Sequence, residues 1–357
     1  MKRAVAGALL IASLQSFGQE EQKPSPFTVS GYVEVYYSYD FNKPENNAKP
    51  GFMYSHNRHN EFNLNLGFIK GSYNTERVRA NLALAAGTYM NANYAAEPGV
   101  LKNIYEANAG VKLSKKQNLW LDAGIFASHI GFESAISKDC WTLTRSIVAD
   151  NSPYYETGAK FTWTSADSKW LLSGLVLNGW QRINRVDGNS LMSFGTQVQF
   201  RPSDKALLNY STFIGTDKPD SVRLMRYYHN LYGIFTAGKL GITAGFDIGS
   251  EQKEKGSSNM NVWYTPVLIL RYPLSEKWTI AARGEYYSDE KGVIIASGTE
   301  NGFQAAGYSL NIDYAPVSNA LIRLEARSLK SRDNVFTKQL QPTDANTMVT
   351  ASIAISF

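Results

Sequence analysis

The last eleven residues, 347–357, alternate between an apolar side chain and one that is mostly small or polar. The apolar phase consists of Val349, Ala351, Ile353, Ile355 and Phe357. A period of two residues predicts a β-strand with one apolar face. An open apolar edge invites aggregation, and closing the sheet into a barrel removes it. We therefore predict that this strand closes a β-barrel by pairing with segment 27–41, with Ser352 and Ser356 towards the interior.

The composition fits a barrel that meets lipid on its outside. Charged residues make up only 19% of the 357 residues, whereas the chain holds 21 Tyr, 17 Phe and 7 Trp. Low charge with many aromatic residues is typical of sheets with an apolar outer band and aromatic girdles. A secreted β-sandwich or propeller is compatible with the same composition. The net charge of +5 is too small and too scattered to predict nucleic-acid binding, and the single cysteine, Cys140, allows no internal disulfide.

The amino terminus carries an export signal. Lys2 and Arg3 precede an apolar run over 4–14, and small residues at positions 16 and 18 mark a cleavage site. We predict a signal peptide at 1–18, a short periplasmic lead-in at 19–26 and a transmembrane β-barrel over 27–357. No later stretch reaches the roughly 18 apolar residues of a membrane-spanning helix. A protein exported across the inner membrane of a Gram-negative cell would then span the outer membrane with strands.

Alternating segments recur along the whole mature chain. We count about 16 strands, uncertain by about two because segments 225–237 and 259–274 have an ambiguous phase and Pro266 interrupts the second. Turns of two to about five residues alternate with longer loops, the asymmetry of antiparallel up-and-down transmembrane barrels with short periplasmic turns and long outer loops. In the second strand we expect one outward phase, which consists of Phe62, Leu64, Leu66 and Phe68.

Charged residues fall on the phase opposite the apolar runs. A Lys or Arg on the lipid face at mid-depth would cost roughly 2–4 kcal/mol, and burying unpaired charges in an apolar core costs several kcal/mol each. A water-filled lumen avoids both costs, and about 16 strands leave room for one. The predicted pore-lining residues are Glu34, Glu61, Arg77, Arg79, Glu106, Lys112, Asp122, Glu156, Lys160, Arg201, Asp247, Arg271, Arg283, Glu285, Asp313, Arg323, Glu325 and Arg327.

These pore-lining residues are nine basic and nine acidic, so ion selectivity would come from their local placement. The densest groups are Arg77 with Arg79, and Arg323, Glu325 and Arg327, which we interpret as a polar ladder along the pore. The alternative for any one of them is a charge that pairs with a neighbouring strand and supports the wall.

The segment 129–152, after the fifth strand, lacks the period of two, and its part at 137–148 suits one or two helical turns. Its apolar residues Trp141, Leu143, Ile147 and Val148 need a packing surface, and long loops without turn residues are usually functional or packed. We predict that it folds into the lumen and narrows it. The candidate constriction residues are Glu133, Lys138, Asp139 and Arg145. A lid over the outer mouth is the alternative.

Three adjacent stretches of this region also resemble a known family. They are Gly-Phe-Glu-Ser-Ala at 131–135, Lys-Asp-Cys-Trp-Thr-Leu-Thr-Arg-Ser at 138–146 and Asp-Asn-Ser-Pro-Tyr-Tyr-Glu-Thr-Gly-Ala at 150–159. They are similar to the signature of the OmpL-like β-barrel porins of Bacteroidetes-type bacteria. The resemblance implies an outer-membrane porin and assigns no substrate. By resemblance to other bacterial barrels, Phe357 would serve as the signal for the β-barrel assembly machinery.

The combined prediction is a porin for passive diffusion of small polar solutes or ions. The alternatives are a closed structural or adhesion barrel and a substrate-specific transporter channel. About eight residues between the predicted cleavage site and the first strand leave no room for a plug domain. His59, His129 and His229 lie in no nucleophile motif, so we predict no catalytic residues and no cofactor, and the loop pair His56 and His59 is a poor metal site. The expected partners are outer-membrane lipid, the assembly machinery, small polar solutes and, as one option, two further copies in a homotrimer.

Overall fold

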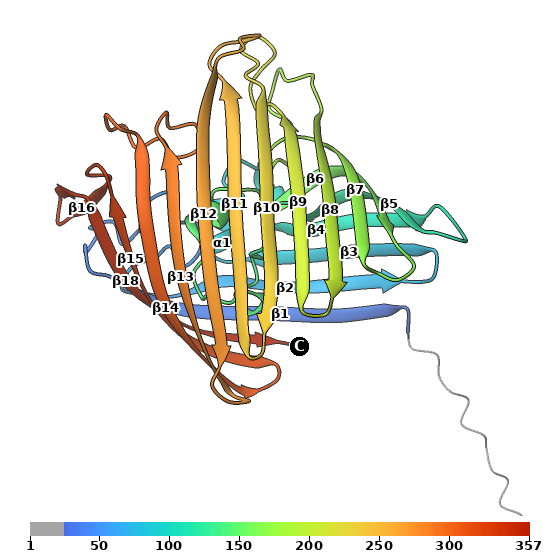
Figure 1. The fold of residues 1–357 in the computed structure, drawn as a ribbon, viewed down its shortest axis with the longest axis horizontal. Coiled ribbons are helices and arrows are strands. Elements are labelled where there is room, and N and C mark those ends of the chain that lie inside the picture. The colour runs from blue at the N-terminus through green and yellow to red at the C-terminus, as the bar shows by residue number, and fades with distance from the viewer. Residues whose placement is uncertain (1–24) are drawn as a thin grey trace, which may run out of the picture.

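The computed structural model describes residues 25–357 and shows one closed antiparallel barrel of sixteen strands. The predicted signal peptide at 1–18 and most of the lead-in at 19–26 lie outside the described residues. The strands follow one another around the barrel in chain order, so that β10, β11 and β12 stand side by side in Figure 1. No helix within 25–357 is long and apolar enough to cross a membrane. The sixteen-stranded barrel confirms the predicted fold class.

The barrel strands are β1 (Phe27–Asp40), β2 (Phe62–Asn74), β3 (Val78–Ala86), β4 (Ile104–Lys112), β5 (Asn118–Ala127), β6 (Tyr155–Thr164), β7 (Trp170–Leu177), β8 (Ser193–Ser203), β9 (Ala206–Gly215), β10 (Arg226–Ala237), β11 (Leu240–Gln252), β12 (Met260–Pro273), β13 (Trp278–Asp289), β14 (Phe303–Val317), β15 (Ala320–Ser331) and β18 (Ala345–Ser356). The loops hold the helices α1 (Thr88–Asn93) and α2 (Ile147–Asp150), the 3₁₀ turns η1 (Gly99–Asn103) and η2 (Ser137–Asp139), and a hairpin of β16 (Phe336–Lys338) and β17 (Gln341–Thr343). We call the barrel end that carries these elements the long-loop end, and the opposite end the short-turn end.

The carboxyl-terminal strand closes the barrel. β18 pairs antiparallel with β1 on one side, in a register that sets Tyr36 opposite Ser352, and with β15 on the other. Neither β1 nor β18 therefore has an open edge. The predicted pairing of the last strand with segment 27–41 is confirmed, and the physical reason is the one that the alternation indicated: the apolar edge is covered by another strand.

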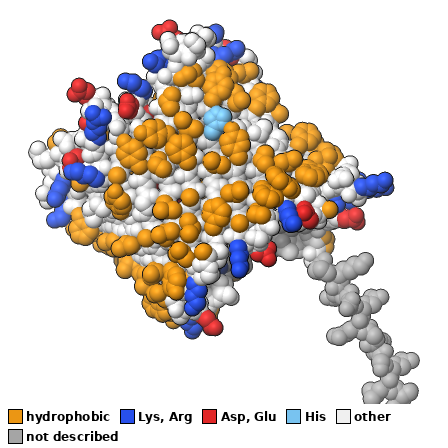
Figure 2. Space-filling model, in the orientation of Figure 1, with side chains coloured by type: hydrophobic (Ala, Val, Ile, Leu, Met, Phe, Trp, Pro, Cys, Tyr) orange, Lys and Arg blue, Asp and Glu red, His pale blue; other side chains and the backbone are white. Residues whose placement is uncertain are grey.

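The two phases of the closing strands face different surroundings. Val33 and Ile353 are exposed on the outer wall, whereas Glu34 and Ser352 are buried on the inner face. In the view of Figure 2, hydrophobic side chains cover the wall, and the charged side chains gather towards its margins. This distribution follows the strand period of two, and an outer surface of this kind suits a lipid environment.

One predicted phase is wrong, because β2 contains an irregularity. The β1–β2 register shifts between Glu34 and Val35, which pair with Leu66 and Leu64 and leave Asn65 as an extra residue. An extra residue moves every later side chain to the opposite face. Leu66 is accordingly buried, and Phe68 packs inside against Tyr32 with ring centroids 5.7 Å apart. Phe62 keeps the predicted outward orientation and is 85% exposed.

The ambiguous segment around Pro266 forms one continuous strand, β12. Its pairing with β11 is unbroken, whereas its pairing with β13 omits residues 265 and 266. Proline has no backbone N–H to donate to a neighbouring strand. The strand accommodates Pro266 because its pairing is interrupted only on the β13 side, while the pairing with β11 holds it in place. Trp263 and Val267 then point inward and are buried, and Leu268 is exposed on the outer wall.

Candidate channel lumen

The predicted pore-lining residues differ in how much solvent they meet. Those buried in the barrel are Glu34, Asp122, Glu156, Asp247, Arg283, Glu285, Asp313, Arg323, Glu325 and Arg327. Those of intermediate exposure are Glu61, Arg79, Glu106, Lys112, Lys160 and Arg271, and Arg77 and Arg201 are exposed. Arg77 lies in the short turn before β3, and Arg201 lies near the short-turn end of β8, where side chains reach solvent.

One group of charges lines β2 to β6. Arg79 Nε donates to Asp122 Oδ1 at 2.6 Å, and its guanidinium carbon lies 4.3 Å from the centre of the Trp120 ring. Lys70 Nζ donates to Glu106 Oε2 at 2.5 Å. Each of these partly exposed pairs reaches across one intervening strand along the wall and still presents charge to the interior. Lys70 was not among the predicted pore-lining residues, because the extra residue in β2 reverses its phase.

A second group joins β13, β14 and β15. Arg323 Nε donates to Asp313 Oδ1 at 2.7 Å, and these residues are direct cross-strand partners. Arg283 and Glu325 approach to 3.0 Å, and Arg327 and Glu285 to 2.6 Å. Buried ion pairs need further hydrogen bonds to offset the loss of hydration. The segment 128–154, which we call the inner segment, provides them.

The inner segment is bound to this second group through its backbone. Arg323 donates to the carbonyl oxygen atoms of Ser137 at 2.5 Å and Cys140 at 3.1 Å. Glu325 Oε2 accepts from the Thr144 amide at 2.6 Å, and Arg283 Nη1 donates to the Thr144 carbonyl at 2.6 Å. Buried backbone outside a strand must find such partners.

The residues that we interpreted as a polar ladder on β15 are therefore covered by the inner segment. Arg323, Glu325 and Arg327 are 1%, 1% and 3% exposed. Their charges meet backbone groups and opposite charges on β13 and β14 instead of open water. The inner segment has no strand partner, so its amides and carbonyls take Arg323 and Glu325 as partners.

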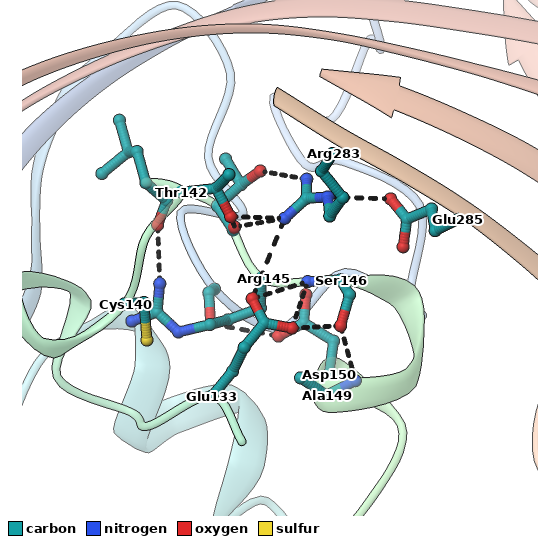
Figure 3. A network of polar contacts seen from close by, with 12 residues as sticks. Glu133, Cys140, Thr142, Arg145, Ser146, Ala149, Asp150, Arg283 and Glu285 are labelled. Carbon is teal, nitrogen blue, oxygen red and sulfur yellow. Dashed lines mark hydrogen bonds and ion pairs between the residues drawn. The ribbon is translucent and has the colours of Figure 1, made fainter. Parts of the chain in front are cut away.

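The four candidate constriction residues have different surroundings. Arg145 is buried and donates to the carbonyl oxygen atoms of residues 134, 135 and 143, so it ties the inner segment together. Glu133 accepts from the Ser146 amide at 3.1 Å, and the two side chains also bond (Figure 3). Burial raises the pKa of the Glu133 carboxyl. Lys138 donates to Ser356 Oγ at 2.5 Å, and Asp139 is exposed.

Apolar side chains of the inner segment fill part of the interior. Ile130, Ile147 and Val148 are buried in a cluster with Phe213 of β9 and Trp263 of β12. Side chains from three other loops join the same cluster: Met53, Ile295 and Phe336. Ile147 and Val148 were among the apolar residues expected to need a packing surface, and side chains of other loops supply part of that surface together with the wall.

The structure pairs two histidines with acidic residues of the inner face, which the sequence did not indicate. His56 Nε2 lies 3.1 Å from Glu34. The His129 ring nitrogens lie 2.8 Å from Glu156 Oε2 and 2.8 Å from the Thr212 carbonyl oxygen. Although burial disfavours the charged ring, Glu156 raises the pKa of His129. The only signal in the sequence was the acidic residue of each pair, which is Glu34 on the inner phase of β1 and Glu156 on the inner phase of β6.

The histidines do not form a common site. His229 lies on the outer face of β10, where Nδ1 is 2.7 Å from the Tyr210 hydroxyl, and His59 Nδ1 accepts from the Asp40 amide at 2.9 Å. Within residues 25–357, no three His, Cys, Asp or Glu side chains are grouped to bind a metal ion. Pairs with acidic residues of the inner face account for His56 and His129, and ring hydrogen bonds to the Tyr210 hydroxyl and the Asp40 amide account for His229 and His59.

Solved structures with the same fold are porins and related outer-membrane channels. An anion-selective porin from Comamonas acidovorans superposes with a TM-score of 0.61 at 10% identity, covering 93% of this chain and 99% of that chain. OmpT of Vibrio cholerae gives a TM-score of 0.60 at 10% identity, with coverage of 93% and 97%. OmpF of Salmonella typhi, in complex with daunomycin, gives 0.60 at 9% identity, with coverage of 93% and 97%.

None of the curated proteins compared with this chain matches it. A family model does match, over residues 26–357, and its description is "Putative beta-barrel porin-2, OmpL-like". The match covers the whole barrel, from the residue before β1 to the terminal Phe357. The chain is therefore an outer-membrane β-barrel protein that belongs to this OmpL-like porin family.

Proposed function

We propose that the protein forms a channel through the outer membrane for passive diffusion of small polar solutes or ions. The observation that carries this proposal is a closed sixteen-strand barrel whose outer wall is apolar and whose inner face holds paired and partly exposed charges. A barrel of about 16 strands encloses enough space for an aqueous path. The partly exposed charges of β2 to β6, including Arg79, Glu106 and Lys160, are the residues that we propose to line it.

The inner segment narrows this path in our proposal. Its hydrogen bonds to Glu285, Arg323 and Glu325 hold it against the inner face of β13 and β15. Space on that side of the barrel is thereby lost to solutes, whereas the β2 to β6 side keeps its partly exposed charges. A lid over the mouth is less well supported, because the partners of the segment are wall side chains.

Membrane orientation and assembly belong to the same proposal. The long-loop end would face outward and the short-turn end the periplasm, as in other transmembrane barrels.

We further propose a cleaved signal peptide at 1–18 and Phe357 as the signal for the assembly machinery. The resemblance at 131–159 alone supports a host of the Bacteroidetes type. A homotrimer is compatible with the trimer form of OmpT from Vibrio cholerae, a protein of the same fold.

Single-channel recording of the purified protein in a planar lipid bilayer tests the function. Discrete conductance steps that scale with salt concentration would support an aqueous pore. The folded state is verified beforehand by the change in gel mobility on heating. A folded barrel that gives no steps would refute the diffusion channel and favour a closed structural or adhesion barrel.

A further inference from the structure

A cavity of about 350 Å³ lies among the loops of the long-loop end. Its lining includes Asn93, Asp150, Trp180, Arg182, Asp217 and Arg226. They come from the loops after β3, β5, β7 and β9 and from the first residue of β10, so that only the folded barrel brings them together. The volume falls in the range of about 300–1,000 Å³ that is usual for small-molecule sites.

The cavity offers hydrogen-bond donors that the protein itself does not use. Arg182 makes an ion pair with Asp217 at 3.9 Å, and its guanidinium donates no hydrogen bond to any described residue. Arg226 directs Nε and Nη2 to Glu251 at 3.0 and 2.7 Å, which leaves Nη1 without a partner in the described part of the chain. Guanidinium donors in a partly buried site bind oxygen acceptors well.

The same cavity offers free acceptors. Asp217 Oδ1 accepts from the Trp180 amide at 3.0 Å, whereas Oδ2 has only the distant ion pair. Asp150 Oδ1 accepts from Ser55 at 3.1 Å and from Tyr154 at 3.2 Å, and Oδ2 accepts no hydrogen bond from residues 25–357. Each carboxylate therefore keeps one oxygen atom for an incoming donor.

Charge balance selects the class of ligand. Two guanidinium groups, Arg182 and Arg226, and two carboxyl groups, Asp150 and Asp217, line the same cavity, while Glu251 pairs with Arg226 from outside the lining. An anion would meet the two carboxyl groups, and a cation would meet the two guanidinium groups. A hydroxyl group both donates and accepts, so that a neutral solute with several hydroxyl groups can use the unused donors and the unused acceptors at once.

An immobilised aromatic ring completes the site. Trp180 packs edge-to-face on Phe213 and Tyr228, with ring centroids 4.9 and 4.8 Å apart, and the guanidinium carbon of Arg226 lies 5.3 Å from the centre of its ring. A fixed indole provides apolar contact area at little cost in conformational entropy, and the C–H face of a pyranose is a suitable partner for it.

We propose that this cavity binds a small neutral sugar, of mono- or disaccharide size, as it enters the channel. The proposal rests on the diffusion function above, for which it names a solute class. Arg182, Arg226, Asp150 and Asp217 hydrogen-bond the hydroxyl groups, and Trp180 contacts the ring face. The site thereby concentrates one class of solute at the entrance without contributing to the permeation path itself.

Intrinsic fluorescence of the detergent-solubilised full chain measures binding without requiring conduction. We expect saturable changes with glucose or sucrose and weaker binding of gluconate and glucosamine, the charged analogues. Arg182→Ala weakens sugar binding about tenfold or more, since it removes hydrogen bonds from a charged donor, and Trp180→Phe removes the signal change. The control Arg223→Ala alters a partly exposed residue that pairs with Asp220 and lies outside the cavity, so it leaves binding unchanged.

The outcomes separate this site from the channel function. Conductance steps without saturable sugar binding overturn the sugar site and leave the channel. Sugar binding that is lost in Arg182→Ala supports the site even where the bilayer shows no steps. Tighter binding of gluconate or glucosamine than of glucose overturns the neutral class, and an equal loss of binding in Arg223→Ala overturns the role of the cavity.

Discussion

The ring of Phe357 occupies the space that Gly31 leaves by having no side chain. A Cβ atom at Gly31 would lie 2.4 Å from Cε2 of that ring. The two backbones are also paired: the Gly31 amide donates to the Phe357 carbonyl oxygen at 2.7 Å, and the Phe357 amide donates to the Gly31 carbonyl oxygen at 3.0 Å. Phe357 thus pairs with the first strand through its backbone and packs against it through its ring, at the place where β1 and β18 meet.

We expect Gly31→Val to hinder closure of the barrel, because the new side chain and the Phe357 ring cannot share one space. Deletion of Phe357 should impair membrane insertion more strongly, since it removes both the ring and the pairing. The yield of heat-modifiable barrel in outer-membrane fractions measures both effects. Val33→Ala, which alters an outward side chain of the same strand, serves as the control, and normal insertion without Phe357 would contradict the assembly role.

Arg283 should be central to the docking of the inner segment. It is fully buried and bonded to Glu325 and to the Thr144 carbonyl oxygen. Figure 3 shows it between Thr142, to which it also donates, and Glu285. Arg283→Ala leaves buried carboxylates unpaired, an effect that typically costs roughly 3–5 kcal/mol. We predict a lower melting temperature and larger or noisier conductance steps as the segment detaches.

Arg271→Ala is the matched control for that experiment. Arg271 lies on the inner phase of the neighbouring strand β12, is only partly buried, and its side chain makes no hydrogen bond or ion pair with any described residue. Its removal should leave the melting temperature and the noise of the steps unchanged. If both variants behave like the wild type, the contacts of Arg283 do not hold the inner segment in place.

Stability should depend on pH through Asp150. Burial raises the pKa of this carboxyl, in the loop after β5, to about 6. A folded pKa above the unfolded value of about 3.9 means that the neutral form favours folding, and this contribution is lost as the pH rises from about 4 through 6. Asp150→Asn should therefore raise the melting temperature at pH 7.5 and raise it by a smaller amount at pH 5.

The comparison of Asp150→Asn with wild type at each pH isolates this group from others that titrate nearby. Glu156 raises the pKa of His129 despite burial of the ring, which also favours the folded state in acid. Burial lowers the pKa values of His56 and His59, which acts in the opposite direction. An equal shift of the melting temperature at pH 5 and pH 7.5 would argue against Asp150 as the titrating group.

Ion selectivity should respond to Arg79. Its side chain is 32% exposed and neutralises Asp122 on the β2 to β6 wall. Arg79→Ala leaves a carboxylate that faces the interior without its partner, so the reversal potential in a KCl gradient should move towards that of a cation-selective pore. Lys115→Ala, which alters an exposed side chain in the short turn between β4 and β5, should leave the reversal potential unchanged. An unchanged reversal potential in Arg79→Ala would show that the conducting path does not pass this wall.

The sequence alone determined the barrel and its closure. Alternation is a local property, and a side chain two residues away lies on the same face whatever else the chain does. For that reason the number of strands, the short turns and the pairing of the last strand with the first could be predicted from segments such as 347–357. The acidic and basic residues of β13 to β15 were likewise assigned to the inner face by phase alone.

Only the tertiary structure decided which of these charges meet water. The extra residue Asn65 in β2 reversed Leu66 and Phe68, because a shift in strand pairing depends on the partner strand and leaves no local signal. The burial of Arg323 and Glu325 depends on a loop nearly two hundred residues away that lacks strand partners for its backbone. Contacts between distant segments are set by how the closed barrel places them, and no periodicity within one segment encodes that placement.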